Sequence, residues 1–162
     1  MMFKRILFYS LLIIFIFNCE KDDICLEGTP GTPRLIIRFF DQNEKIIPKP
    51  LSNVTIKALN KDEDYVVFSG DSLGIPLKLI SNSTIYTFTY LDILDNQEKI
   101  DTLKFNYKRE DYYLNRACGF LSNLIFTTPA LEILDKESIF LGFRILNDTI
   151  KNENQAHLAI YH

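Results

Sequence analysis

Three cysteines are the residues of this chain best suited to defined chemistry: Cys19, Cys25 and Cys118. Cys19 directly follows an apolar run, residues 6–17, which a short basic segment precedes. Such a segment forms a secretory signal, because about a dozen apolar residues are too few for a bilayer-spanning helix of about 20. A cysteine at the processing point is typical of a bacterial lipoprotein. We therefore expect a lipoprotein signal peptide over residues 1–18 and a lipid on Cys19.

The residue before this cysteine departs from the usual pattern. Asn18 stands where a small residue is common. The alternative is an ordinary signal peptide cut near Asn18, which would leave Cys19 as a plain thiol. That alternative leaves an odd number of cysteines in an exported chain, whereas acylation of Cys19 leaves an even pair.

The remaining pair, Cys25 and Cys118, lies in a chain bound for an oxidising compartment. Disulfides form and persist in such compartments, so a Cys25–Cys118 bridge is the natural expectation. It would close a loop of nearly a hundred residues, which the chain-entropy model values at roughly 4 to 5 kcal/mol. The alternative is two buried free thiols.

Composition indicates one folded domain and argues against nucleic acid as a partner. The chain is 47% hydrophobic and 13% aromatic, which is far from the signature of disorder. Removing Lys4 and Arg5 with the signal leaves 16 basic against 21 acidic residues, a net charge of −5. The mature chain therefore has no basic stripe that could neutralise phosphates.

Residues 19–33 have the composition of a tether, with charged residues, glycine and proline and no apolar periodicity. From residue 34 onward apolar residues alternate with polar ones, and a period of two predicts strands. The predicted strands are residues 34–41, 53–59, 65–68, 73–79, 85–93, 100–107, 118–126, 138–146 and 155–161.

Some of these segments carry more detailed expectations. Residues 65–68 and 73–79 read as a hairpin, and Pro76 places the second strand at a sheet edge, because proline cannot donate to a ladder. Residues 127–137 are either one helical turn or a long loop. Alternation in 138–146 puts Leu141 on the apolar face and Phe140 on the opposite one.

About eight short strands without an amphipathic helix indicate an all-β, antiparallel β-sandwich over residues 34–162. The antibody-type signature fails, since the chain has no Trp and Arg116 stands where the corner tyrosine would be. Immunoglobulin-like and transthyretin-like topologies both remain open.

Four blocks of sequence together carry a family resemblance: 19–25, 32–39, 71–77 and 115–120. They resemble an uncharacterised family of small Bacteroidota lipoproteins of the flavobacterial type, labelled domain of unknown function 6452, over nearly the whole chain. The resemblance implies an exported, cysteine-paired lipoprotein with no assigned chemistry. It also implies a neighbouring outer-membrane barrel protein as a possible partner.

Two further signals follow from the same bacterial group. Lys21, Asp22 and Asp23 resemble the signal that sends lipoproteins to the outer face of the outer membrane; the alternative is a solvated linker on a protein of the periplasmic face. Asp followed by Ser or Thr and an aliphatic residue resembles the O-glycosylation sequon, which predicts acceptors at Ser72, Thr102 and Thr149. The alternative is a turn aspartate before a β-branched strand residue.

No arrangement of residues points to catalysis, a cofactor or a metal. His157 is expected on the solvent face of the last strand and His162 at a frayed end, with no free thiol or acid placed to form a catalytic arrangement. No acidic segment keeps the spacing of a calcium loop. We therefore expect a protein that is not an enzyme and has no cofactor.

Two functions remain. The first is an outer-membrane lipoprotein, lipid-anchored at the cell surface, that acts as a binding or envelope-assembly module. The second is a small-ligand or glycan-binding lipoprotein that stacks sugar on tyrosine and phenylalanine rings. Exposure of the rings separates the two: Tyr86, Phe88, Tyr90, Tyr107, Tyr112 and Tyr113.

Overall fold

The computed structural model describes residues 24–29, 31–92 and 96–162, and in these ranges it contains strands and no helix. Accordingly, no described segment is a helix long and apolar enough to cross a membrane. The strands are β1 (Leu35–Phe40), β2 (Leu51–Ala58), β3 (Val66–Gly70), β4 (Ser72–Ile75), β5 (Ser83–Leu91), β6 (Glu98–Asn115), β7 (Gly119–Ile133), β8 (Gly142–Ile145), β9 (Thr149–Ile150) and β10 (Leu158–Tyr161).

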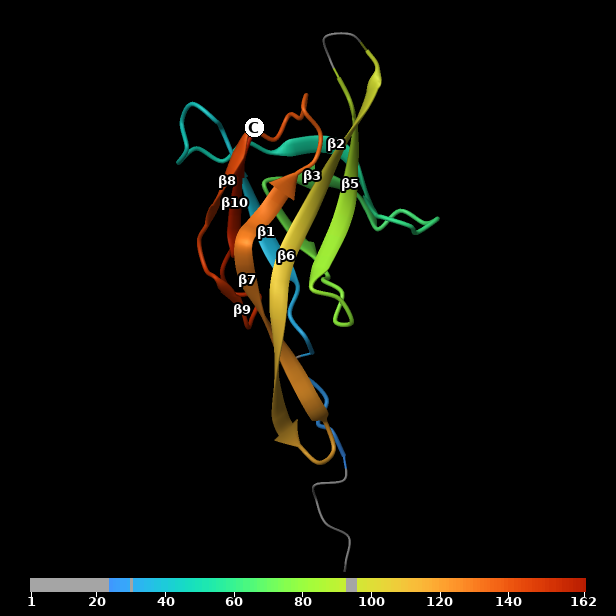
Figure 1. Cartoon of the computed structure of the whole chain (residues 1–162), viewed down its shortest axis with the longest axis vertical. Coiled ribbons are helices and arrows are strands. Elements are labelled where there is room, and N and C mark those ends of the chain that lie inside the picture. The colour runs from blue at the N-terminus through green and yellow to red at the C-terminus, as the bar shows by residue number, and fades with distance from the viewer. Residues whose placement is uncertain (1–23, 30, 93–95) are drawn as a thin grey trace, which may run out of the picture. The chain divides into compact units, whose positions relative to one another are not determined.

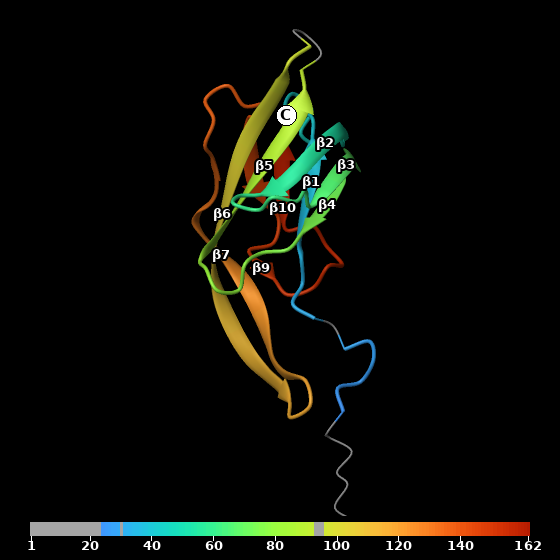
Figure 2. The ribbon, with the colours of Figure 1, turned by 90° about the vertical axis from the view of Figure 1, so that its right-hand side faces the viewer.

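The strands form two sheets, which confirms the predicted all-β sandwich (Figure 1). One sheet has the order β4-β1-β10-β8 and the other the order β3-β2-β5-β6-β7-β9. The described strand pairings are antiparallel except for that of β1 with β10, which run parallel with Ile37 opposite Leu158. The first and last strands are therefore neighbours in the smaller sheet (Figure 2).

Alternation along the strands builds the core between the sheets. Leu35, Ile37 and Phe39 of β1 are fully buried while the residues between them are only partly covered. Strands β5 and the first half of β6 show the same period of two. Because successive strand residues point to opposite faces, one apolar set from each sheet is removed from water.

The predicted hairpin of residues 65–79 is wrong. β3 pairs with β2 in the six-stranded sheet, whereas β4 pairs with β1 in the four-stranded sheet. The chain changes sheet at Gly70, whose φ of +152° is a conformation that L side chains rarely adopt. β4 is an edge strand, as expected from Pro76, and it ends one residue before that proline.

Two C-terminal expectations also need correction. Residues 127–133 are neither a helical turn nor a loop, because β7 continues to Ile133. β8 begins only at Gly142, and before it Phe140 is buried while Leu141 is exposed, which reverses the predicted faces. The alternation misleads here because Phe140 lies before the strand, where a period of two no longer applies. The two-residue strand β9 was not predicted at all.

The chain divides into two compact units. Of the described residues, the smaller unit contains 24–29 and Tyr113–Phe120, and the larger contains those of 31–112 and Leu121–His162. Residues 24–29, which we predicted to be part of a tether over 19–33, thus belong to a unit that also holds the turn between β6 and β7.

Candidate functional site

A disulfide joins Cys25 to Cys118, as predicted, with Cα atoms 4.8 Å apart and a sequence separation of 93. Local hydrogen bonds shape both ends of the bridge. The amide of Cys118 donates to Oδ1 of Asn115 at 2.7 Å, and Thr29 Oγ1 donates to the Leu26 carbonyl at 2.8 Å. The bridge is the only disulfide among the described residues, and it joins the two segments of the smaller unit.

The other N-terminal predictions lie outside the described residues. These are the signal peptide of residues 1–18, the lipidated Cys19 and the export signal at Lys21, Asp22 and Asp23. They stay predictions.

The three sequon hydroxyls occupy different environments and do not come together in one sheet. Ser72 is exposed at the start of β4 in the four-stranded sheet. Thr102 is half-buried in β6, opposite Thr87 of β5. Thr149 is half-buried in β9, and its hydroxyl donates to the Asp148 carboxylate at 3.0 Å. Ser72 is therefore the acceptor that a glycosylating enzyme could reach most readily in the folded chain.

The aspartates of two sequons have structural partners that the turn pattern did not reveal. Asp71 forms an ion pair with Arg38, Oδ2 to Nη2, at 2.8 Å. Asp101 is 2% exposed, and its Oδ2 accepts hydrogen bonds from Ser138 Oγ at 2.8 Å and from the Ile139 amide at 2.9 Å. Burial raises the pKa of Asp101, although these two bonds oppose the shift.

Both histidine predictions are wrong, because both imidazoles serve the fold. His157 is buried rather than solvent-facing, and its Nδ1 accepts the amide hydrogen of Ile36 at 3.1 Å. The backbone of His162 is paired at both groups, since its amide donates to Phe40 O and its carbonyl accepts from Gln42 N. His162 Nε2 also lies 2.9 Å from the Lys49 carbonyl. No local pattern in the chain indicated these distant partners.

Most of the aromatic residues considered for sugar stacking are buried. Tyr86, Phe88 and Tyr90 point into the core. Tyr107 is also buried, and its hydroxyl donates to the Lys78 carbonyl at 2.8 Å. Of the six rings considered for sugar stacking, only Tyr112 and Tyr113 are exposed. A stacking site needs exposed ring faces, and the row of Tyr86, Phe88 and Tyr90 does not provide them.

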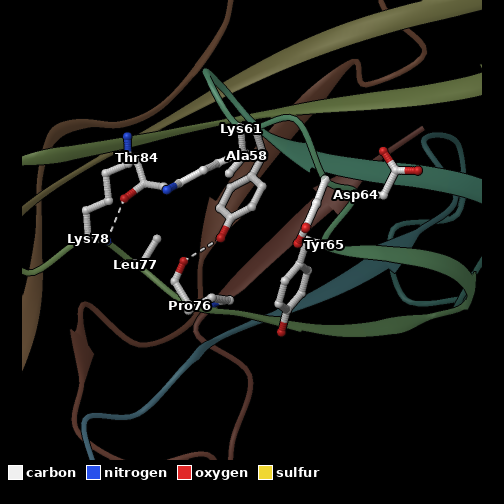
Figure 3. Close-up of a pocket in the computed structure, with 10 residues that line it drawn as sticks. Ala58, Lys61, Asp64, Tyr65, Pro76, Leu77, Lys78 and Thr84 are labelled. Carbon is white, nitrogen blue, oxygen red and sulfur yellow. Dashed lines mark hydrogen bonds between the residues drawn. The ribbon is translucent and has the colours of Figure 1, made fainter.

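A pocket of about 430 Å³ is the most apolar hollow on the larger unit among those described (Figure 3). The segment after β2 and the segment after β4 line it, with β5 behind. Tyr65 and Tyr86 meet edge to face there, with ring centroids 6.2 Å apart. The Tyr86 hydroxyl donates to the Pro76 carbonyl at 2.7 Å, and burial raises the pKa of Tyr86.

Charged side chains from the segments after β2 and β4 line the same pocket. They are Lys61, Glu63, Asp64 and Lys78, two cations and two anions. The pocket thus offers a small apolar wall and a mixed-charge lining, which suits weak binding of an amphipathic group. Within the described ranges no three His, Cys, Asp or Glu side chains gather as metal ligands would.

A family model described as "Family of unknown function (DUF6452)" matches residues 53–162, about two thirds of the chain. The chain belongs to the DUF6452 family. No curated protein matches the chain, and no solved structure matches it.

The DUF6452 match contains two of the four blocks on which the resemblance was based, 71–77 and 115–120. It therefore includes Cys118 but not Cys25. The matched DUF6452 range contains the pocket, the Asp101 contacts and both histidines. The partners of the histidines lie before this range, in β1 and in the loop that follows it.

Proposed function

We propose that this DUF6452 protein is an outer-membrane lipoprotein, anchored through an acylated Cys19, that serves as a binding or envelope-assembly module. The Cys25–Cys118 disulfide is the observation that carries the proposal. Stable disulfides belong to oxidising compartments, which supports export by the predicted signal. Because the bridge uses the other two cysteines, Cys19 remains as the single thiol available for a lipid.

The short distance from the lipid to the bridge supports an assembly role. Cys19 lies six positions before Cys25, a span of at most about 20 Å when fully extended. A longer tether through residue 33 would allow the domain to move much farther from the membrane. The bridge therefore holds the domain close to a partner embedded in the same membrane, such as a barrel protein.

The anchor itself is tested by mass spectrometry of the protein purified from native membranes. A diacylated or triacylated Cys19 at the mature N-terminus supports the proposal. An unmodified N-terminus generated by cleavage near Asn18 would refute it. A Cys19→Ala variant serves as the control, since it should leave the membrane fraction while the Cys25–Cys118 bridge still forms.

The assembly role is tested by crosslinking and co-purification from native membranes. We expect one membrane-embedded partner to be captured by the unaltered protein. A flexible linker inserted between Cys19 and Cys25 keeps the disulfide but lengthens the reach, so it should reduce the capture. Unchanged capture would show that the bridge only stabilises the fold.

Location on the cell surface follows from the proposed export signal at Lys21, Asp22 and Asp23. Protease treatment of intact cells should digest the protein, and replacing the two aspartates with asparagine should protect it. Full protection of the unaltered protein would place it on the periplasmic face instead. Glycans on Ser72, Thr102 and Thr149 are a separate part of the proposal: a native mass equal to the acylated polypeptide would exclude them.

A small-ligand binder is the second candidate function, and the pocket between Tyr65 and Tyr86 is the observation that favours it. Tyr65→Ala should weaken any ligand found by thermal-shift screening, because Tyr65 is the exposed ring of the pair. Tyr112→Ala removes an equally exposed ring away from the pocket lining and is the matched control.

A further inference from the structure

The smaller compact unit carries a concentration of exposed apolar side chains. Ile24 and Leu26 are each 77% exposed, and Phe120 is 68% exposed. Tyr113 is exposed as well, and the rings of Tyr113 and Phe120 meet edge to face with centroids 5.4 Å apart. We call these four residues the apolar patch. Exposed apolar clusters of this kind usually mark a surface that contacts something other than water.

The disulfide gathers the patch from two distant segments. Cys25 stands between Ile24 and Leu26, and Cys118 stands two positions before Phe120. With the two cysteine Cα atoms 4.8 Å apart, both segments are held in one unit. The bridge thus does more than close a loop, because it brings aliphatic and aromatic side chains into the same small unit.

The charge of this unit favours a neutral apolar partner. Its described residues, 24–29 and 113–120, include one acid, Glu27, and one base, Arg116, so their formal charges cancel. Tyrosine and phenylalanine favour the interface between lipid headgroups and hydrocarbon, where an apolar ring body is removed from water and a hydroxyl stays hydrated. Nothing in this composition requires an anionic lipid.

The length of chain before the described residues decides which partner lies within reach. The chain outside the structure ends at Asp23, directly before Ile24, and Cys19 precedes Cys25 by six positions. If the acyl chains of Cys19 lie in a bilayer, Cys25 stays within about 20 Å of the membrane surface. The patch, whose residues flank the two bridged cysteines, therefore stays within reach of the lipid surface.

We infer that the apolar patch inserts into the headgroup region of the bilayer that holds the acylated Cys19. This inference rests on the proposed anchor. Insertion would remove the four side chains from water and would add to the membrane affinity of the acyl chains, because interfacial binding grows with buried apolar area. The disulfide then holds together the two segments that form a second membrane contact.

The test exploits the absence of tryptophan from the chain. A Phe120→Trp variant places a single fluorescent probe in the patch, and Ile46→Trp places one at an 86% exposed position of the larger unit as the matched control. Each full-length, lipidated variant is purified from native membranes and reconstituted into phosphatidylcholine vesicles with or without brominated acyl chains. Thermal unfolding and the intact mass establish that both variants fold and keep the bridge.

We expect the Phe120→Trp probe to emit at shorter wavelength in vesicles than in detergent-free buffer, and to be quenched by brominated lipid. The Ile46→Trp probe should emit at long wavelength and respond to aqueous iodide instead. Raising the salt concentration should leave the lipid quenching unchanged, since the patch has no net charge.

Flotation of the vesicles separates the two proposals. Protein that fails to float would refute the anchor and the proposed function with it. Protein that floats while both probes respond alike to iodide and not to bromine would overturn the membrane contact of the patch alone. Burial of the Phe120→Trp probe in native membranes but not in pure lipid would also overturn it, because a protein partner would then cover the patch.

Discussion

Ile36 and His157 hold each other through two hydrogen bonds. The amide of Ile36 donates to Nδ1 of His157 at 3.1 Å, and the amide of His157 donates to the Ile36 carbonyl at 2.8 Å. Since Nδ1 accepts a hydrogen, the imidazole must be neutral and carry its proton on Nε2. Protonation of Nδ1 would place two hydrogens against each other at the start of the parallel pairing of β1 and β10.

The first prediction is therefore a loss of stability in mild acid. Burial lowers the pKa of His157, although the backbone of Asn152 and the Glu153 carboxylate oppose the shift. The unfolded chain takes up this proton near the ordinary histidine pKa of 6.5, before the folded protein does. The contribution of His157 to the free energy of unfolding should thus be fully present above that pH and should be lost as the pH drops below it. Urea unfolding between about pH 7.5 and pH 5 measures this.

The control separates His157 from the second histidine, whose pKa burial also lowers. His157→Leu should cost about 1 to 3 kcal/mol at neutral pH, because the Ile36 amide loses its acceptor, and should flatten the dependence of the unfolding free energy on pH. His162→Gln should leave the contribution of His157 to that dependence in place. A pH profile unchanged by His157→Leu would contradict the assignment.

The second prediction concerns Asp101, whose titration has the opposite sign. Because burial raises its pKa, the folded protein binds this proton before the unfolded chain does. Its contribution to stability should therefore increase as the pH falls from its raised pKa toward the ordinary value of 3.8. Asp101→Asn abolishes this increase yet keeps an acceptor oxygen for Ser138 and Ile139, and urea unfolding at several pH values measures the difference.

Asp101→Ala provides the comparison, since it removes the acceptor as well. It should destabilise the protein by about 1 to 3 kcal/mol at neutral pH, whereas Asp101→Asn should cost much less. Equal losses in the two variants would mean that the negative charge, and not the acceptor geometry, holds the segment before β8.

The third prediction tests the unexpected inward face before β8. Phe140 is buried with its ring centroid 5.3 Å from that of Phe88, while the adjacent Leu141 is 60% exposed. Phe140→Ala should cost about 3 to 5 kcal/mol in denaturant unfolding because it leaves a cavity between the sheets. Leu141→Ala should change stability by less than about 0.5 kcal/mol. The sequence alternation predicts the reverse order, so the pair of variants decides between them.

The fourth prediction is that reduction weakens the fold. The bridge spans 93 positions, and the chain-entropy model assigns a loop of about 100 residues roughly 4.7 kcal/mol. Cys118→Ser should lower the melting temperature, and the intact mass of the unaltered protein should rise by about 2 Da on reduction, as expected for one disulfide. Absence of that mass change would mean that the two thiols are free.

Local patterns predicted the strands well, because the alternation that marks a strand involves only residues close together in the sequence. Leu35, Ile37 and Phe39 show period two in the sequence and are buried together on β1. The Cys25–Cys118 pairing could also be predicted from the sequence, because an exported chain with a lipidated Cys19 has only these two cysteines left to pair. The sheet to which each strand belongs could not be predicted, since β3 and β4 are adjacent in sequence yet join different sheets.

The misplacement of His157 has a physical cause. Its imidazole satisfies a backbone group far away in the sequence, the amide of Ile36. A polar residue in a strand pattern is read as solvent-facing unless its distant partner is known. The apolar patch went unrecognised for the same reason, because Ile24 and Phe120 belong to one unit only through a bridge that joins remote segments.

The parallel pairing of β1 with β10 has a consequence for when the protein can fold. β10 lies between β1 and β8, so the four-stranded sheet lacks its central strand until residues 158–161 are available. A chain that emerges amino end first has to keep residues 37–40 unpaired on that edge of β1 until β10 is available. Contacts between such distant segments form slowly. The four-stranded sheet can therefore be completed only after β10 has been released, and the timing of that release limits how early the fold can form.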